Sequence, residues 1–279
     1  MTTTLRPTGP IQRDESGATS RTYDVCVNGR PVGAVELAAD PGAGRPVGYI
    51  RSLRIDDADR RRGRGTVAAL AAEEVLRGWD CTEVRAAVPA DADPALRLAR
   101  ALGYTERGRN MIKEVAAPPP SLPEHVEGRP MTETEFGHWR AQAVRHFARD
   151  WISGGVPEDE ALARSEAVHA RLLPGGLATP GAHLHILLAD STPVGHVWLS
   201  EREVRPGEDG AYVFDVEVAE AFRRRGHGRA LMLLAERIAA GAGQRLIALH
   251  VFEGNEPART LYESLGYRTT HRNLVKRLL

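Results

Sequence analysis

The sequence has little cysteine, few aromatic residues and no excess of charge of either sign. Only Cys26 and Cys81 occur among 279 residues, which excludes a disulfide scaffold and a thiolate metal site and favours a reducing compartment. Acidic and basic residues number 37 each, so the overall charge gives no reason to expect a nucleic acid as partner. With aromatic residues at 5%, the sequence also offers no platform for stacking bases.

Long hydrophobic runs and a targeting pattern are absent as well. No apolar stretch approaches the roughly 20 residues that span a bilayer, and Met1 to Pro10 show no basic segment followed by an apolar one. We therefore expect a cytoplasmic protein that is neither exported nor bound in a membrane. Its hydrophobic content of 42% is enough to form the cores of two domains.

The chain contains an internal repeat. A shift of 163 positions places Tyr212–Val275 on Tyr49–Ile112 without a gap. The match includes two arginine- and glycine-rich segments, Arg223–Gly228 and Arg60–Gly65, and a Leu-Gly-Tyr sequence in each half. Agreement of this kind is improbable by chance and indicates two halves with one shared fold.

Both halves contain a Pro-Val-Gly sequence, at Pro31–Gly33 and Pro193–Gly195, and the distance between the two is one residue less than the shift of 163. The halves differ upstream of this sequence. About 60 residues precede it in the C-terminal half and about 30 in the N-terminal half. The additional residues have helical patterns in Glu133–Trp151 and Pro157–Leu173, separated by the breaker Ser153–Gly155. We expect this helical pair in the C-terminal half only.

A proline-rich segment separates the halves. Ala116–Pro123 favours an extended chain because proline cannot continue a helix. We place an N-terminal domain at 1–115, a linker at 116–130 and a C-terminal domain at 131–279. Strands alternating with helices predict an α/β (or α+β) fold in each domain, with a central mixed sheet and flanking helices. We expect the N-terminal domain to be truncated at its start.

The apolar spacing predicts the same order of elements in both halves. In the C-terminal half, a hairpin and a further strand precede the glycine-rich loop, and a helix, a strand and a second helix follow it. The predicted elements are strands Leu184–Leu188, Gly195–Leu199 and Tyr212–Val218, helix Ala230–Ala240, strand Arg245–Phe252 and helix Glu256–Leu265. Gly266 is the expected end of the last helix.

The glycine-rich loop predicts an anion site. Gly226 and Gly228 permit a tight turn and leave no side chain between the backbone amides and a ligand. Amides at the start of a helix attract anions, and the helix dipole adds to this, so a pyrophosphate would fit there. The alternative is a purely structural turn between strand and helix.

At these residues the sequence resembles the GNAT superfamily of acyl-CoA-dependent N-acetyltransferases. Arg223–Gly228 is similar to the family's Arg/Gln-x-x-Gly-x-Gly/Ala loop. Asn255–Tyr267 resembles its Asn-x-x-Ala-x-x-Leu-Tyr-x-x-x-Gly-Phe/Tyr segment. The resemblance covers about 150 residues in the C-terminal half and about 90 in the N-terminal half.

The resemblance implies which residues bind acetyl-CoA, the expected acyl donor. The pyrophosphate would lie on the loop amides, and the pantetheine arm would pair with the strand before the loop. Asn255, at a helix N-cap, would contact the pantetheine or serve as a cap alone. The implied binding residues are Val216, Val218, Arg223, Arg224, Arg225, Gly226, His227, Gly228, Arg229 and Asn255.

The resemblance also implies the catalytic groups. Tyr262 stands at the position of the family's general acid, which protonates the leaving thiolate; a buried aromatic residue is the alternative reading. His250 is the expected general base, unless it is structural, and Asp215 and Glu217 compete for that role. The amide of Val216 would polarise the thioester carbonyl.

The N-terminal half lacks these side chains. The residues that match His250, Asn255 and Tyr262 are, in that order, Ala87, Ala92 and Ala99. We interpret this half as a degenerate copy that is empty or structural, with CoA binding through Arg61–Thr66 as the alternative.

The sequence thus predicts an N-acetyltransferase that moves an acetyl group from acetyl-CoA to a primary amine by direct attack. A non-catalytic acyl-CoA sensor or assembly module, and a tandem enzyme resembling mycothiol synthase, are the alternatives. We expect no metal, because no cysteine or carboxylate set accompanies His183 and His185. We expect either a monomer that forms an intrachain pseudo-dimer or a homodimer; the acceptor is open.

Overall fold

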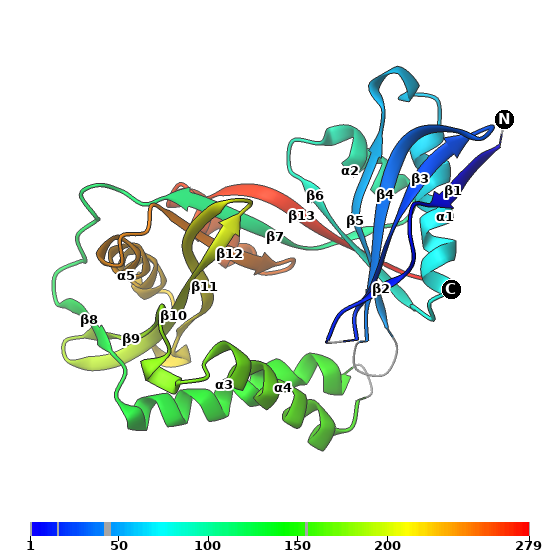
Figure 1. Cartoon of the computed structure of the whole chain (residues 1–279). Coiled ribbons are helices and arrows are strands. Elements are labelled where there is room, and N and C mark those ends of the chain that lie inside the picture. The colour runs from blue at the N-terminus through cyan, green and yellow to red at the C-terminus, as the bar shows by residue number, and fades with distance from the viewer. Residues whose placement is uncertain (1, 16, 42–45, 154–155, 279) are drawn as a thin grey trace. The chain divides into compact units, whose positions relative to one another are not determined.

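The chain forms two compact units, each with a β-sheet and helices packed on it (Figure 1). Unit 1 comprises residues 1–109 and 270–279, and unit 2 comprises residues 110–269. The computed structural model describes residues 2–15, 17–41, 46–153 and 156–278. No helix in these ranges is long and apolar enough to cross a membrane.

The two halves of the repeat exchange their last strands. Strand β7 (Thr105–Glu114) ends the N-terminal half, and β13 (Arg268–Arg277) ends the C-terminal half. In unit 1, β13 pairs antiparallel with β6 (Glu83–Pro89) over seven residue pairs. In unit 2, β7 is the neighbour of β12 (Leu246–Phe252). Each half therefore completes the sheet that the other half begins.

Because of this exchange, the units differ from the predicted domain ranges 1–115 and 131–279. The division falls before Asn110, inside β7, and the last ten residues join unit 1. The predicted linker, 116–130, contains strand β8 (Val126–Pro130), which pairs with β9 (Ala182–Ala189). The physical reason for the strand exchange is that an edge strand exposes unpaired backbone groups, and a matching strand from either half can form hydrogen bonds with them.

The sheet of unit 1 has the order β1-β3-β4-β5-β6-β13, and β2 pairs with β3. Helices α1 (Arg64–Arg77) and α2 (Asp93–Ala101) follow β5 and β6. The part of unit 1 that the structure describes has no α-helix before β4, which confirms the predicted truncation. The other strands are β1 (Thr3–Pro7), β2 (Gln12–Arg13), β3 (Thr19–Val27), β4 (Arg30–Asp40) and β5 (Val47–Ile55).

Unit 2 contains the predicted helical pair, α3 (Glu133–Ser153) and α4 (Glu158–Leu172). A capping box starts α3, since the amide of Glu135 donates to Thr132 Oγ1 and the amide of Thr132 donates to the Glu135 carboxylate. The predicted breaker residues Gly154 and Gly155 lie outside the described residues. The remaining elements are β10 (Thr192–Arg205), β11 (Glu208–Val218), α5 (His227–Gly241) and α6 (Glu256–Ser264).

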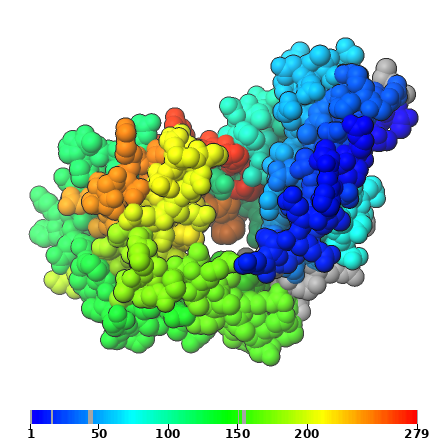
Figure 2. Space-filling view, in the orientation of Figure 1, coloured from blue at the N-terminus to red at the C-terminus, as the bar shows by residue number. Residues whose placement is uncertain are grey.

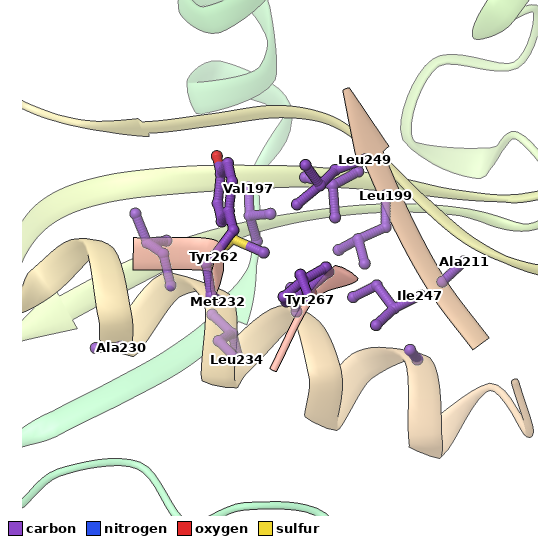
Figure 3. Packing of buried hydrophobic residues seen from close by; sticks show 14 of the residues in the cluster. Val197, Leu199, Ala211, Ala230, Met232, Leu234, Ile247, Leu249, Tyr262 and Tyr267 are labelled. Atoms are coloured by element: carbon purple, nitrogen blue, oxygen red, sulfur yellow. The ribbon is translucent and has the colours of Figure 1, made fainter. Parts of the chain in front are cut away.

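Alternation along β10 divides the core of unit 2 into two layers. Val197 and Leu199 pack in one cluster with residues of α5, β12 and α6, which Figure 3 shows around Tyr262. Trp198 points to the opposite face, where it packs with Phe136 and Trp139 of α3. The outer sides of α3 and α4 are exposed (Figure 2). The sheet therefore separates an α5–α6 side from an α3–α4 side.

Candidate active site

The glycine-rich loop of unit 2 turns directly into the start of α5. Arg224 and Gly226 both have positive φ, +65° and +86°, and Gly226 is the N-cap of the helix. In the described part of the chain no side chain caps this end, and the first backbone bond of the helix runs from Ala230 N to Gly226 O. The amides of His227, Gly228 and Arg229 thus have no helical acceptor and are suited to bind an anion.

The loop arginines have different partners. Arg223 ties the loop to the end of β11, because its Nε donates to the Val218 carbonyl at 3.1 Å. Arg225 lies over the Phe222 ring, 5.7 Å from the centroid. Arg229 donates to Ser264 Oγ at 2.6 Å, which connects α5 with α6. Arg223 and Arg229 therefore shape the loop as well as carrying positive charge beside it.

Strands β11 and β12 are paired at one end and separated at the other. Their parallel register covers only Ala211–Val213 with Ile247–Leu249, although β11 continues to Val218 and β12 to Phe252. Val216 and Val218 thus pair with β10 on one side and lie beyond the register with β12 on the other. This opening leaves backbone groups of β11 that an extended ligand arm can bond.

A β-bulge in β11 sets the side chains at this opening. Trp198 pairs with Asp215 and Leu199 with Val213, so Phe214 is the additional residue. The bulge brings Phe214 onto the Trp198 ring, with centroids 4.6 Å apart, and brings Asp215 to the α3 side of the sheet.

The Asp215 carboxylate is held from two elements. Its Oδ2 accepts hydrogen bonds from Trp139 Nε1 on α3 and from His196 Nε2 on β10, both at 2.9 Å. Burial raises the pKa of Asp215, but the bond and charge of His196 and the bond from Trp139 outweigh it and bring the pKa below its ordinary value. The carboxylate is therefore ionised at neutral pH.

Tyr262 lies on α6 and is only 6% exposed. Burial raises the pKa of its hydroxyl to about 12, and the charge of Asp215 acts in the same direction. The hydroxyl thus stays protonated at neutral pH, as a proton donor must.

His250 follows the last residue pair between β11 and β12. Its Nδ1 is 3.0 Å from Asn110 Oδ1 on β7, and its ring centroid is 4.8 Å from that of Phe252. Because an amide oxygen only accepts, Nδ1 carries the proton in this contact, so in the neutral ring the lone pair is on Nε2. Among the competing bases, Glu217 is exposed and pairs with Arg223 at 3.4 Å.

Asn255 caps α6, since its Oδ1 accepts a bond from the amide of Ala258 at 3.2 Å. The capping role predicted for Asn255 is thereby confirmed. At the matching place in unit 1, Ala92 makes no such bond.

Three residues at this site were not predicted from the sequence: Trp139, His196 and Asn110. The repeat held a signal for His196, since the shorter offset places Ala34 at its position, and a histidine in an apolar strand is unusual. Trp139 has no counterpart in the N-terminal half. Asn110 reaches His250 only through the strand exchange.

Comparisons with known proteins show the family to which the chain belongs. The family described as "Acetyltransferase (GNAT) family" matches residues 4–104 and 142–267. An uncharacterized N-acetyltransferase of Bacillus subtilis, YycN, is 33% identical over 152 residues, which are 53% of this chain and 96% of the relative. A mycothiol acetyltransferase of Brachybacterium faecium is 28% identical over 252 residues, 83% of this chain and 70% of the relative.

Two solved structures share the fold over most of the chain. A GCN5-related N-acetyltransferase from Sphaerobacter thermophilus has a TM-score of 0.58 at 20% identity, covering 92% of this chain and 80% of its own. A tandem GNAT protein from the clavulanic acid biosynthesis pathway has a TM-score of 0.52 at 20% identity, covering 95% and 85%. Both likenesses concern the fold alone.

Proposed function

Since the chain belongs to the GNAT acetyltransferase family and is an N-acetyltransferase, we propose that its C-terminal half carries out the reaction and acetylates a primary amine. One observation carries this proposal. Both halves keep the loop and the separated strands, but only the C-terminal half has Tyr262, His250 and Asn255 where the N-terminal half has alanine.

The donor, acetyl-CoA, would lie along the opening of β11. The amides from Arg224 to Arg229 would bind the pyrophosphate, and the backbone of Val216 and Val218 would pair with the pantetheine. Gly226 and Gly228 leave these amides uncovered. Asn255 would contact the pantetheine while it caps α6.

The proposed reaction is a direct attack of the acceptor nitrogen on the thioester carbon. The Val216 amide stabilises the oxyanion, and the C–S bond breaks as the carbonyl re-forms. His250 Nε2 takes a proton from the amine, and the Tyr262 hydroxyl gives one to the departing thiolate. The products are the N-acetylated acceptor and free CoA, and no acetyl group is held covalently by the protein.

Replacement of Tyr262 by Phe tests the catalytic assignment. We expect kcat to fall about 10²-fold, because the thiolate loses its proton donor, while the Kd of acetyl-CoA stays the same. Steady-state kinetics with calorimetry would measure both. Tyr267→Phe is the matched control, since Tyr267 is also buried and its hydroxyl has no hydrogen-bond partner among the described residues. Equal loss in both variants, or none in Tyr262→Phe, would contradict the assignment.

The pH dependence of kcat gives a second test. With the Tyr262 pKa at about 12, the acid stays protonated, so we expect no decline of kcat between about pH 8 and pH 10. A falling limb in this range that disappears in Tyr262→Phe would show that the tyrosine ionises near its ordinary value.

A second candidate acceptor is the cysteine-containing thiol precursor that the resemblance to mycothiol synthase implies, because the match to a mycothiol acetyltransferase extends over both halves. An acceptor that carries its amine on a cysteine residue should then be preferred over the same molecule with serine. Equal kcat/KM for the two would favour a simple amine.

A further inference from the structure

Trp139, His196 and Asp215 form a constellation, here called the Asp215 trio, that the proposed reaction does not use. Trp139 Nε1 and His196 Nε2 both donate to Oδ2 of the Asp215 carboxylate, and the described residues donate no hydrogen bond to Oδ1. Trp139 is 6% exposed, whereas the Asp215 side chain keeps 36% of its surface exposed. Oδ2 is thus fixed by two hydrogen bonds, and the carboxylate is still accessible to solvent.

The position of the trio points to the acceptor. Asp215 lies two residues beyond Val213, where the pairing of β11 with β12 ends, on the face of the sheet that α3 covers. Asp215 directly precedes Val216, whose backbone lies in the opening of β11 where the thioester would be held. An anion fixed there is close to the place where the acceptor nitrogen must attack.

Comparison of the two halves of the repeat distinguishes a role of the Asp215 trio in acceptor binding from a purely structural role. In unit 1, Glu36 pairs with Ser52, and the same register shift follows, so the bulge exists without an aspartate. Ala34 replaces His196, and no counterpart of α3 is present in the described part of that unit. The trio is therefore lost together with Tyr262, His250 and Asn255, while the bulge and the separated strands remain.

On these grounds, and resting on the proposed function, we propose that the Asp215 trio binds the protonated amino group of the acceptor through Oδ1. The acceptor is then an alkylammonium cation and not a weakly basic amine such as an arylamine. A carboxylate forms strong, short hydrogen bonds with an ammonium group. His250 first takes one proton from the ammonium group, which leaves the neutral amine to attack. As the C–S bond breaks, the Tyr262 hydroxyl gives its proton to the thiolate, and the second proton that the nitrogen loses passes to the tyrosinate oxygen.

In this arrangement Trp139 and His196 are positioning residues. They hold Oδ2 so that Oδ1 keeps one orientation toward the acceptor. Because both are donors to the same oxygen, loss of one leaves the other in place, and the effect of each should be smaller than that of Asp215.

The test compares alkylamines, represented by benzylamine, tyramine and putrescine, with aniline as the neutral amine. We expect the wild type to acetylate alkylamines in preference to aniline. Asp215→Asn should raise the KM of the alkylamines about tenfold to a hundredfold and change kcat less, with no change for aniline. Glu217→Gln, on the same strand, is the matched control and should leave KM unchanged.

A second variant tests the same inference in case Asp215→Asn does not fold. Trp139→Phe keeps an aromatic ring but removes the donor, and should raise the KM of the alkylamines a few-fold at an unchanged Kd of acetyl-CoA. The inference is overturned if both variants keep the wild-type KM, if aniline is as good a substrate as benzylamine, or if no alkylamine is acetylated. Failure of acetyl-CoA binding by the C-terminal half would instead overturn the proposed function.

Discussion

Replacement of Gly228 by Trp should abolish acetyl-CoA binding, whereas Gly65→Trp should leave it intact. Gly228 is the second residue of α5, and a Cβ there would meet Leu261 at 3.4 Å and Val218 at 4.0 Å. An indole group at this point covers the amides that would bind the pyrophosphate. Gly65 occupies the same place on α1, with Leu98 at 3.5 Å, and is thus a control of equal steric change.

Calorimetry with acetyl-CoA measures this outcome as the number of sites per chain. One site, lost only in Gly228→Trp, would support the C-terminal half as the donor-binding half. The two variants are well matched because the two loops have the same backbone conformation. Arg61 and Gly63 have positive φ values of +58° and +73°, like Arg224 and Gly226. Two sites, or loss in Gly65→Trp, would assign a ligand to unit 1; no binding would contradict the proposed donor.

The elements near the two motifs could be predicted closely from the sequence. Helix α6 was expected at Glu256–Leu265 and spans Glu256–Ser264, because an Asn cap and a Gly stop mark both ends. Helix α5 begins at His227, three residues before its predicted start at Ala230, because Gly226 adopts the left-handed conformation and starts the helix inside the loop.

The partners of the last strands could not be predicted. Strands β7 and β13 occupy equivalent places in the repeat, and the local pattern of either fits both sheets. The contact between Trp139 and Asp215 spans 76 residues and depends on how α3 packs, which periodicity does not contain. Local signals thus predicted the glycine-rich loop and the helix that carries Tyr262, while the groups that surround Asp215 and His250 required the tertiary structure.

One feature of the sequence does distinguish the exchanged strands: the chain has only two lysines, and each lies on one of them. Lys113 on β7 binds Glu236 of α5 at 2.6 Å, and Lys276 on β13 binds Glu73 of α1 at 2.7 Å. Both glutamates are almost fully buried, at 2% and 1% exposure. Each pair therefore joins a strand from one half of the repeat to a helix from the other.

Lys113→Met should destabilise unit 2 by about 3–5 kcal/mol, because it leaves the Glu236 carboxylate buried without its cation. The amide of Ala116 still donates to Glu236 at 2.8 Å, but a single neutral donor does not replace a positive charge. The double variant Lys113→Met with Glu236→Met removes both charges and should recover most of the stability. Urea unfolding followed by tryptophan fluorescence reports mainly on unit 2, where Trp139, Trp151 and Trp198 lie, while the fourth tryptophan, Trp79, lies in unit 1.

Arg164→Met provides the control for loss of a surface cation. Arg164 pairs with Glu160 on the same helix, where both side chains are partly exposed, so we expect a change below about 1 kcal/mol. If Lys113→Met unfolds at the wild-type urea concentration, the buried pair does not hold β7 on α5. If the double variant is no more stable than the single one, the loss comes from packing of the lysine stem and not from the unpaired charge. Recovery in the double variant would show that unit 2 tolerates replacement of both members of the Lys113–Glu236 pair but not the loss of the lysine alone.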